Sequence, residues 1–160
     1  MPSAARGPLP QDEYEAIYGR VPRLTVEVVV ATAAGVLLTR RETGPCQGLW
    51  HIPGGTVRFG EPLTDAVQRV ALQELGLEVS AGPLLGYIEY PSHLLRGLDW
   101  PVGIAFRAEP ATSSASGRPA SGSSAHRLLG KPGAAGWFAH LPDNMHDEQK
   151  AFLKAHGFAG

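Results

Sequence analysis

A glutamate on the apolar side of an amphipathic helix is the first residue whose position suggests chemistry. Between residues 61 and 75 the apolar side chains recur with the period of a helix. On a wheel of about 100° per residue, Glu74 falls roughly 20° from both Leu63 and Val67. A carboxylate there is costly to bury unless it has a partner. Glu74 therefore either turns out to water or meets an arginine at the helix end, or it binds a metal ion.

The loop before this helix favours the metal-ligand interpretation. Gly54 and Gly55, which follow Pro53, carry no side chain, so a backbone carbonyl there can approach a ligand closely. Carbonyl and carboxylate oxygens are the ligands that hard cations such as Mg²⁺ prefer. The sequence predicts a cation held between this loop and Glu74.

The same residues resemble the signature of the Nudix hydrolase family, G-x5-E-x7-R-E-U-x-E-E-x-G-U, where U is a bulky aliphatic residue. The positions that match the signature are Gly55, Glu61, Arg69, Glu74, Gly76 and Leu77. Two acidic positions of the signature are instead Val70 and Gln73. The resemblance thus implies a site that holds fewer metal ions than that of a standard member.

The stretch from Leu37 to Val79 is similar to the GDP-mannose mannosyl hydrolase branch of that family, which also lacks these acids. Enzymes of that branch break the bond between the anomeric carbon of the sugar and the diphosphate oxygen. A metal and arginines would stabilise the departing nucleoside diphosphate while a general base directs water to the sugar carbon.

The resemblance implies a role for each matching residue. The metal, Mg²⁺ or alternatively Mn²⁺, would be bound by Gly54 and Glu74, while Arg41 and Arg69 would face phosphates beside Gly55. Two further residues are candidates from their own positions: Gln73 could complete the metal shell if the enzyme attacks phosphorus, and Arg58, in the loop before the helix, could contact phosphate. The candidate catalytic residues are Arg69, Glu74 and His126. Glu61 would be structural.

The general base is the position at which the chain departs most from that branch. The branch places a Gln-His pair shortly before the tryptophan of the last strand, whereas GKPGAAG precedes Trp137 here. His126, at the end of a Ser/Gly-rich loop, could swing into this role, or it could simply be solvated. His93 is a second candidate of the same kind.

The elements that must position these residues follow from hydrophobic pattern and turn residues. We expect one domain over residues 1–160, with an N-terminal extension over 1–20 and a flexible loop over 111–125. The expected strands cover 24–33, 35–41, 84–90, 102–109 and 136–138, and the expected helices cover 61–75 and 147–156. Residues 44–60 are expected to form a structured loop with brief strands. The resemblance implies an α/β fold: a Nudix-type α/β/α sandwich with a mixed central sheet and the Nudix loop-helix.

Composition excludes several classes of protein. A net charge of -1 and a pI near 6.6 argue against nucleic-acid binding. The single cysteine, Cys46, excludes an internal disulfide and a zinc cage built of cysteines, and we expect an inert thiol. The chain shows neither a signal peptide nor an apolar membrane span, so we expect a cytoplasmic protein. Trp50, Trp100 and Tyr87 could stack on a base, or pack in the core.

Three functions remain open at this point. The first is a Mg²⁺-dependent hydrolase of a nucleoside diphosphate sugar or a related nucleoside diphosphate derivative. The second is a nucleotide pyrophosphohydrolase that attacks phosphorus. The third is a binding or sensing domain that keeps the diphosphate pocket and has lost turnover. The resemblance also implies a homodimer.

Overall fold

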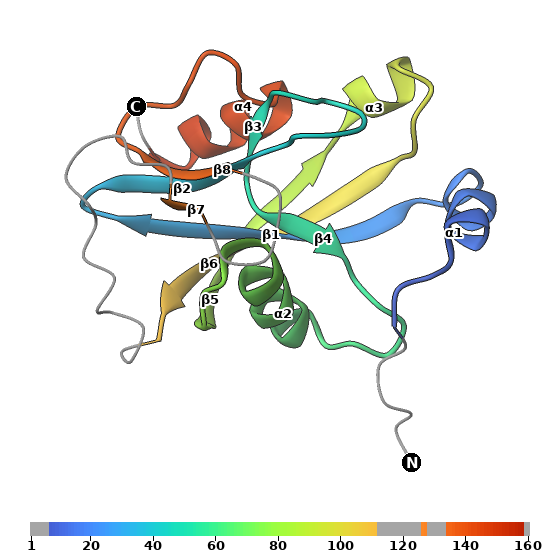
Figure 1. Cartoon of the computed structure of the whole chain (residues 1–160), viewed down its shortest axis with the longest axis horizontal. Coiled ribbons are helices and arrows are strands. Elements are labelled where there is room, and N and C mark those ends of the chain that lie inside the picture. Colours follow the sequence, from blue (N-terminus) through green and yellow to red (C-terminus); the bar gives the residue numbers. More distant parts are fainter. Residues whose placement is uncertain (1–6, 112–125, 128–133, 159–160) are drawn as a thin grey trace.

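The computed structural model describes residues 7–111, 126–127 and 134–158, which form helices and strands (Figure 1). In chain order the elements are α1 (Gln11–Tyr18), β1 (Arg23–Thr32), β2 (Gly35–Arg40), β3 (Trp50–His51), β4 (Gly54–Thr56), α2 (Leu63–Leu75), β5 (Val79–Glu89), α3 (Pro91–Leu95), β6 (Pro101–Pro110), β7 (His126–Arg127), β8 (Ala134–Phe138) and α4 (Asp147–Ala155).

The strands form one mixed sheet. Its order is β5-β6-β1-β2-β8-β7, with β3 paired to β2 and β4 paired to β1. The pair of β1 and β6 is parallel, whereas β1 runs antiparallel to β2 and to β4. Strand β1 thus lies within the sheet between β6 and β2, and it also pairs with the short strand β4, which contains Gly54 and Gly55.

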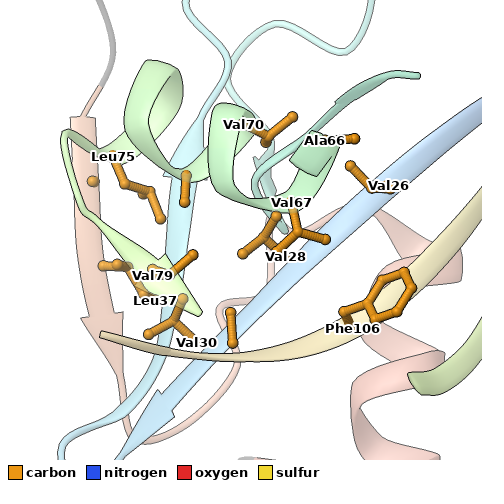
Figure 2. Packing of buried hydrophobic residues seen from close by; sticks show 13 residues of the cluster. Val26, Val28, Val30, Leu37, Ala66, Val67, Val70, Leu75, Val79 and Phe106 are labelled. Atoms are coloured by element: carbon orange, nitrogen blue, oxygen red, sulfur yellow. The ribbon is translucent and has the colours of Figure 1, made fainter. Parts of the chain in front are cut away.

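The side chains of β1 point alternately to the two faces of the sheet. Val26, Val28 and Val30 pack with α2 in one hydrophobic cluster (Figure 2). Val29 packs in a second cluster that includes Leu153 of α4. Helices cover both faces of the sheet, with α2 on one side and α4 on the other (Figure 1). This arrangement confirms the expected α/β/α sandwich with a mixed central sheet.

Helix α2 has the apolar stripe that the sequence predicts. Ala66, Val67, Val70, Ala71 and Leu75 are its buried residues. The helix ends at Gly76, whose φ of 63° is left-handed and allows its N–H to bond back to the last turn. The helix begins at Leu63, two residues after the predicted start, because the carboxylate of Glu61 accepts a hydrogen bond from the backbone of Arg58 and stays in the loop.

Two short helices, the short strand β7 and the start of β5 were not expected from the sequence. Helix α1 lies within the predicted N-terminal extension, and α3 lies between the strands β5 and β6. Strand β5 begins at Val79 and not at Leu84, with shifts in register between Ala81 and Gly86. Pro83 lies in this stretch and has no N–H to donate to the ladder, which favours such an irregularity.

The predicted loop over 111–125 lies, apart from Ala111, outside the described residues. In the part of the chain that the structure describes, no helix has the length and apolar character that crossing a membrane requires.

Candidate active site

A cavity of about 630 Å³ opens beside the loop that contains Gly54 and Gly55. Residues from several distant segments line it: α1 contributes Tyr14 and Tyr18, β1 contributes Glu27, the end of β2 is followed by Arg41, and β4 contributes Gly54 and Gly55. This volume is in the range of pockets that bind nucleotide-sized ligands, roughly 300–1,000 Å³. The cavity joins the loop in which the sequence predicts metal binding to aromatic and charged side chains far from it in sequence.

Glu27 is a buried carboxylate that lines this cavity. Its Oε1 accepts hydrogen bonds from Thr25 Oγ1 at 3.1 Å and from the hydroxyl of Tyr90 at 2.9 Å. Burial raises the pKa of Glu27 to about 7, although these two hydrogen bonds and the charges of Arg23 and Arg41 act in the opposite direction. The side chain is thus able to exchange a proton near neutral pH.

The carboxylate of Glu27 explains why two neighbouring positions are glycine. A Cβ at Gly54 would lie 2.3 Å from Glu27 Oε2, and one at Gly103 would lie 2.7 Å from Oε1. Both distances are well below van der Waals contact, so only glycine leaves room for the carboxylate between β4 and β6. Gln149 extends the network, because its Nε2 donates to the Tyr90 hydroxyl at 3.0 Å and its Oε1 accepts the N–H of Ile52 at 2.7 Å.

The loop between β4 and α2 is held by one arginine. Arg69 Nε donates to Glu61 Oε1 at 2.6 Å, and Nη2 donates to Glu61 Oε2 and to the carbonyl of Thr56, each at 2.9 Å. These hydrogen bonds hold the pKa of Glu61 below its usual value. Glu61 therefore holds the loop in place through hydrogen bonds, which agrees with the structural role that the resemblance implies. Most of the hydrogen bonds that the Arg69 guanidinium donates go to residues of the loop.

The two positions where the signature loses an acid have different surroundings. Val70 is buried in the core cluster, and a Cβ at Gly55 would lie 3.0 Å from its Cγ2. Gln73 is exposed, and its Oε1 accepts a hydrogen bond from Arg69 Nη1 at 3.1 Å. Glu74 is half-buried on the same helix. The helix thus offers one carboxylate and one amide oxygen near the loop.

His51 connects the cavity to Glu74. It lines the cavity, its Nε2 lies 3.1 Å from Thr39 Oγ1, and the charges of both Arg41 and Glu74 act on it. Burial, with a further contribution from Arg41, lowers the pKa of His51 to about 4. The ring is consequently neutral near pH 7 and cannot serve as a general acid there.

Residues 21–117 match the family model of the NUDIX domain, which is more than half of the chain. The chain belongs to the Nudix hydrolase family.

Two curated proteins illustrate the similarity in sequence. Over 93 residues the chain is 45% identical to the low-salt glycan biosynthesis protein Agl8 of Haloferax volcanii, a match that covers 57% of this chain and 60% of that protein. Over 76 residues it is 33% identical to the ADP-ribose pyrophosphatase of Methanocaldococcus jannaschii, with 48% and 45% of the two chains covered. The chain thus spans 60% or less of the length of these relatives.

The fold also matches that of a solved Nudix structure. The MutT NUDIX hydrolase from Burkholderia pseudomallei aligns with a TM-score of 0.59 and 22% identity, over 84% of this chain and 98% of that one. At this identity the match supports the fold of the Nudix domain and no finer statement.

Of the predicted site residues, the structure brings Arg41, Gly54 and Gly55 to the cavity. The α2 residues Arg69, Gln73 and Glu74 are not among the described residues that line it, and Arg69 instead donates to the carbonyl of Thr56 in the loop. Arg58 is likewise not among the described lining residues, and its N–H donates to Glu61. The structure describes the backbone of His126 in β7, paired with Ala135, but not its side chain.

Several residues that line the cavity were not predicted from the sequence. Glu27 is a charged residue inside a run of β-branched residues, and an acid in a strand that should be buried on both faces is a signal that could have identified it. Tyr14 and Tyr18 are spaced by four residues, which places both on one side of α1, with their ring centroids 4.8 Å apart. His51 carried no comparable signal.

The three aromatic residues that the sequence offered for base stacking lie elsewhere. Trp50 packs edge-to-face on Phe138 at 4.7 Å in the second core cluster. Tyr87 is exposed on β5, and Trp100 directly precedes β6. Trp50 therefore serves the core, and among the described aromatics the tyrosines of α1 are better placed beside a ligand in the cavity.

Proposed function

We propose that this Nudix domain is a metal-dependent hydrolase of a nucleoside diphosphate sugar or a closely related nucleoside diphosphate derivative. The observation that carries the proposal is the cavity, because one continuous space is lined by the Nudix loop, by Arg41 and by two tyrosines of α1. A diphosphate needs cationic groups, and a base or sugar needs flat apolar surface. The cavity supplies both.

Binding of the diphosphate is supported by the position of Arg41. This residue follows β2, its backbone exchanges hydrogen bonds with the loop at Gly48 and Leu49, and its charge acts on both Glu27 and His51 inside the cavity. A fixed backbone lets a long side chain present its guanidinium to the cavity, and a guanidinium can bind phosphate oxygens in pairs. Arg41 is therefore our first choice for the phosphate contact, and Arg58 and Arg69 rank behind it.

The Nudix loop and α2 carry oxygen groups of the kind that bind a hard divalent cation. The carbonyl of Gly54, the carboxylate of Glu74 and the amide oxygen of Gln73 are ligands of the type that Mg²⁺ or Mn²⁺ accepts. The buried Val70 offers no oxygen at the first missing acid. A bound cation would supply stabilisation of the negative charge that develops on the departing diphosphate.

Fewer metal ligands favour attack at carbon over attack at phosphorus. With one cation neutralising the diphosphate as a leaving group, the residues of the chain need only position water at the sugar carbon and accept its proton. Glu27 and His126 are the two candidates for that proton. Glu27 lines the cavity, and His126 is the loop histidine that the sequence offers although no histidine matches the position of the base in the related branch.

The names of the relatives are compatible with a sugar-linked substrate and also with its main rival. A relative named for glycan biosynthesis supports the nucleotide sugar, and a relative named an ADP-ribose pyrophosphatase supports attack at phosphorus in a nucleoside diphosphate derivative. Both activities require the same cavity, and they differ in the bond that is broken.

The test is turnover of a panel of nucleotide sugars and nucleoside triphosphates with Mg²⁺ in ¹⁸O-labelled water. We expect free sugar carrying ¹⁸O together with unlabelled nucleoside diphosphate. Glu74→Gln should lose at least about 100-fold in activity, because loss of a metal ligand costs more than loss of a supporting group. Glu78→Gln, which changes an exposed glutamate just beyond the helix, is the matched control and should retain full activity.

Each alternative gives a different result in the same assay. Label in the phosphate product would show attack at phosphorus. No turnover, with a nucleotide sugar still raising the melting temperature, would show a binding domain. The proposals of a homodimer and a cytoplasmic location are tested separately, by sedimentation equilibrium in solution and by cell fractionation.

A further inference from the structure

Three side chains that could bind a transition metal converge at one wall of the cavity. They are His93 in α3, His146 at the start of α4 and Cys46 in the loop between β2 and β3. Each offers one ligand atom, and these atoms all lie within 4.8 Å of one another. The proposed Nudix cation site uses none of these residues.

The two histidines face each other through their Nε2 atoms, which lie 3.4 Å apart. Their Nδ1 atoms are directed toward carboxylates on the other side of each ring. His93 Nδ1 lies 3.2 Å from Asp99 Oδ1, within hydrogen-bond reach. His146 Nδ1 lies 3.1 Å from Glu148 Oε2 but does not form a hydrogen bond with it. If each Nδ1 carries the ring hydrogen, two Nε2 lone pairs point at each other.

Two facing lone pairs repel unless a cation or a proton lies between them. A histidine whose second nitrogen meets a carboxylate is also the usual arrangement around a bound metal ion, because the carboxylate fixes the tautomer and the ring orientation. Here both carboxylates are held in turn. Asp99 forms an ion pair with Arg23, and Glu148 Oε1 accepts the N–H of Ser92 at 2.9 Å.

The distances fit a tetrahedral ion. With zinc–nitrogen bonds of about 2.0–2.1 Å, two imidazole nitrogens of a tetrahedral site lie roughly 3.3–3.4 Å apart, which matches the Nε2 to Nε2 distance. With a zinc–sulfur bond of about 2.3 Å, the sulfur would lie roughly 3.5 Å from each nitrogen, so each sulfur–nitrogen distance, now within 4.8 Å, would shorten by about 1.3 Å or less. Thiolate and imidazole ligands select zinc over magnesium.

The conformation of Cys46 is unusual for its residue type. Its φ of 63° makes it the one described residue other than glycine with a positive φ. Such a backbone costs energy for a residue with a Cβ, and strained residues of this kind cluster at active sites, ligand sites and switch regions. Arg96 Nη1 donates to its Sγ at 3.2 Å, so a positive charge lies beside a sulfur that would be negative as a metal ligand.

We propose that Cys46, His93 and His146 bind one zinc ion at the wall of the cavity. All three residues line the cavity, so a fourth position on the ion is open to water or to an oxygen of a bound substrate. The ion would tie the loop after β2 to α3 and α4, and it would bind whether or not the chain hydrolyses a nucleotide sugar. The single cysteine rules out a cage of cysteines, but it does not rule out this mixed site.

The test uses Zn²⁺ and Co²⁺ on the full chain carrying Glu74→Gln, with excess Mg²⁺ present, so that the Nudix loop does not compete. We expect about one Zn²⁺ per chain by elemental analysis after dialysis. Co²⁺ should give the intense visible bands of a tetrahedral site and a thiolate charge-transfer band in the near ultraviolet. Because the chain has one cysteine, that band can come only from Cys46 and needs no variant to assign it.

Variants then locate the other ligands. His93→Gln and His146→Gln should each weaken Zn²⁺ binding by more than about 100-fold, and Asp99→Asn by about 10- to 100-fold, as expected for a supporting carboxylate. His140→Gln, which changes an exposed histidine, should leave binding unchanged. The proposal is overturned if no Zn²⁺ is retained, as for two rings that share a proton, or if bound Co²⁺ shows no charge-transfer band.

Discussion

Replacing Glu27 with glutamine should change how the stability of the protein depends on pH. The carboxylate lies between β4 and β6, only 5% exposed, and accepts hydrogen bonds from Thr25 and Tyr90. The amide oxygen of a glutamine can accept the same two hydrogen bonds. Glu27→Gln therefore removes the ionisation of this side chain while keeping its volume and its main contacts.

The size of the effect follows from the raised pKa. Burial raises the pKa of Glu27 from 4.5 to about 7, so the folded protein holds this proton more tightly than the unfolded chain does. The contribution to the free energy of unfolding is complete below the unfolded value and is lost as the pH rises through the folded value. Between about pH 5 and about pH 8 the Glu27 side chain thus lowers the free energy of unfolding of the wild type by about 2.5 kcal/mol, a contribution that Glu27→Gln lacks.

The wild-type profile by itself will not display this loss, because His51 acts in the opposite direction. Burial lowers the pKa of His51 from 6.5 to about 4, so its contribution is present above its unfolded pKa and is lost as the pH falls through the folded pKa. The difference between the wild type and Glu27→Gln cancels the His51 contribution. Urea unfolding of both proteins in metal-free buffer, at several values from about pH 5 to about pH 8, measures that difference.

We expect Glu27→Gln to gain about 2.5 kcal/mol relative to the wild type across this range. Glu89→Gln, at an exposed glutamate of β5, is the control and should give a difference that does not change with pH. If the Glu27→Gln difference is equally flat, then Glu27 stays ionised in the folded protein and the argument from burial is wrong.

Three further substitutions test the loop and the cavity. Gly54→Ala should destabilise the fold by about 1–3 kcal/mol in urea unfolding, because its Cβ would overlap the Glu27 carboxylate, whereas Gly7→Ala, with no atom near its Cβ, should be neutral. Arg69→Lys should lower the free energy of unfolding by about 1–3 kcal/mol in the same assay, since lysine cannot make the paired contact with the Glu61 carboxylate. Unchanged stability would show that this contact does not hold the loop. Tyr18→Ala should weaken nucleotide binding by about 3- to 10-fold in calorimetry with no change in metal affinity, and full retention of affinity would place the base elsewhere.

The sequence predicted the elements whose side chains repeat with a clear period. The stripe of α2 and the valines of β1 bury apolar side chains against each other, and burial of this kind leaves a pattern that can be read locally. Helix α1 has no buried residue, so no stripe marks it. Its value to the protein lies in Tyr14 and Tyr18, which reach the cavity, and that role depends on the placement of the helix and not on its own pattern.

The candidate site was predictable only where residues act within one short stretch. Arg41, Gly54 and Gly55 lie close together in sequence, so these cavity residues could be named in advance, whereas the metal-binding role of Glu74 stays a prediction. Glu27 depends on Tyr90, which is 63 residues away, and His93 meets His146 across 53 residues. Contacts at such separations are made by the fold of the sheet, and a single sequence without its fold does not indicate which distant residues will meet.

The two missing acids of the Nudix signature differ in how far the fold depends on their replacements. Val70 is 1% exposed and packs in the cluster under the loop, so a carboxylate there would have to be buried among the valines of β1. Gln73 is exposed beside the Arg69 guanidinium, where a carboxylate would gain a charged partner. Restoring an acid at position 70 would therefore disrupt the core, whereas restoring one at position 73 would not. A site in which one acid has become core cannot regain a full set of metal ligands by changes at its surface, which is the physical reason to expect chemistry that needs a single cation at the Nudix loop.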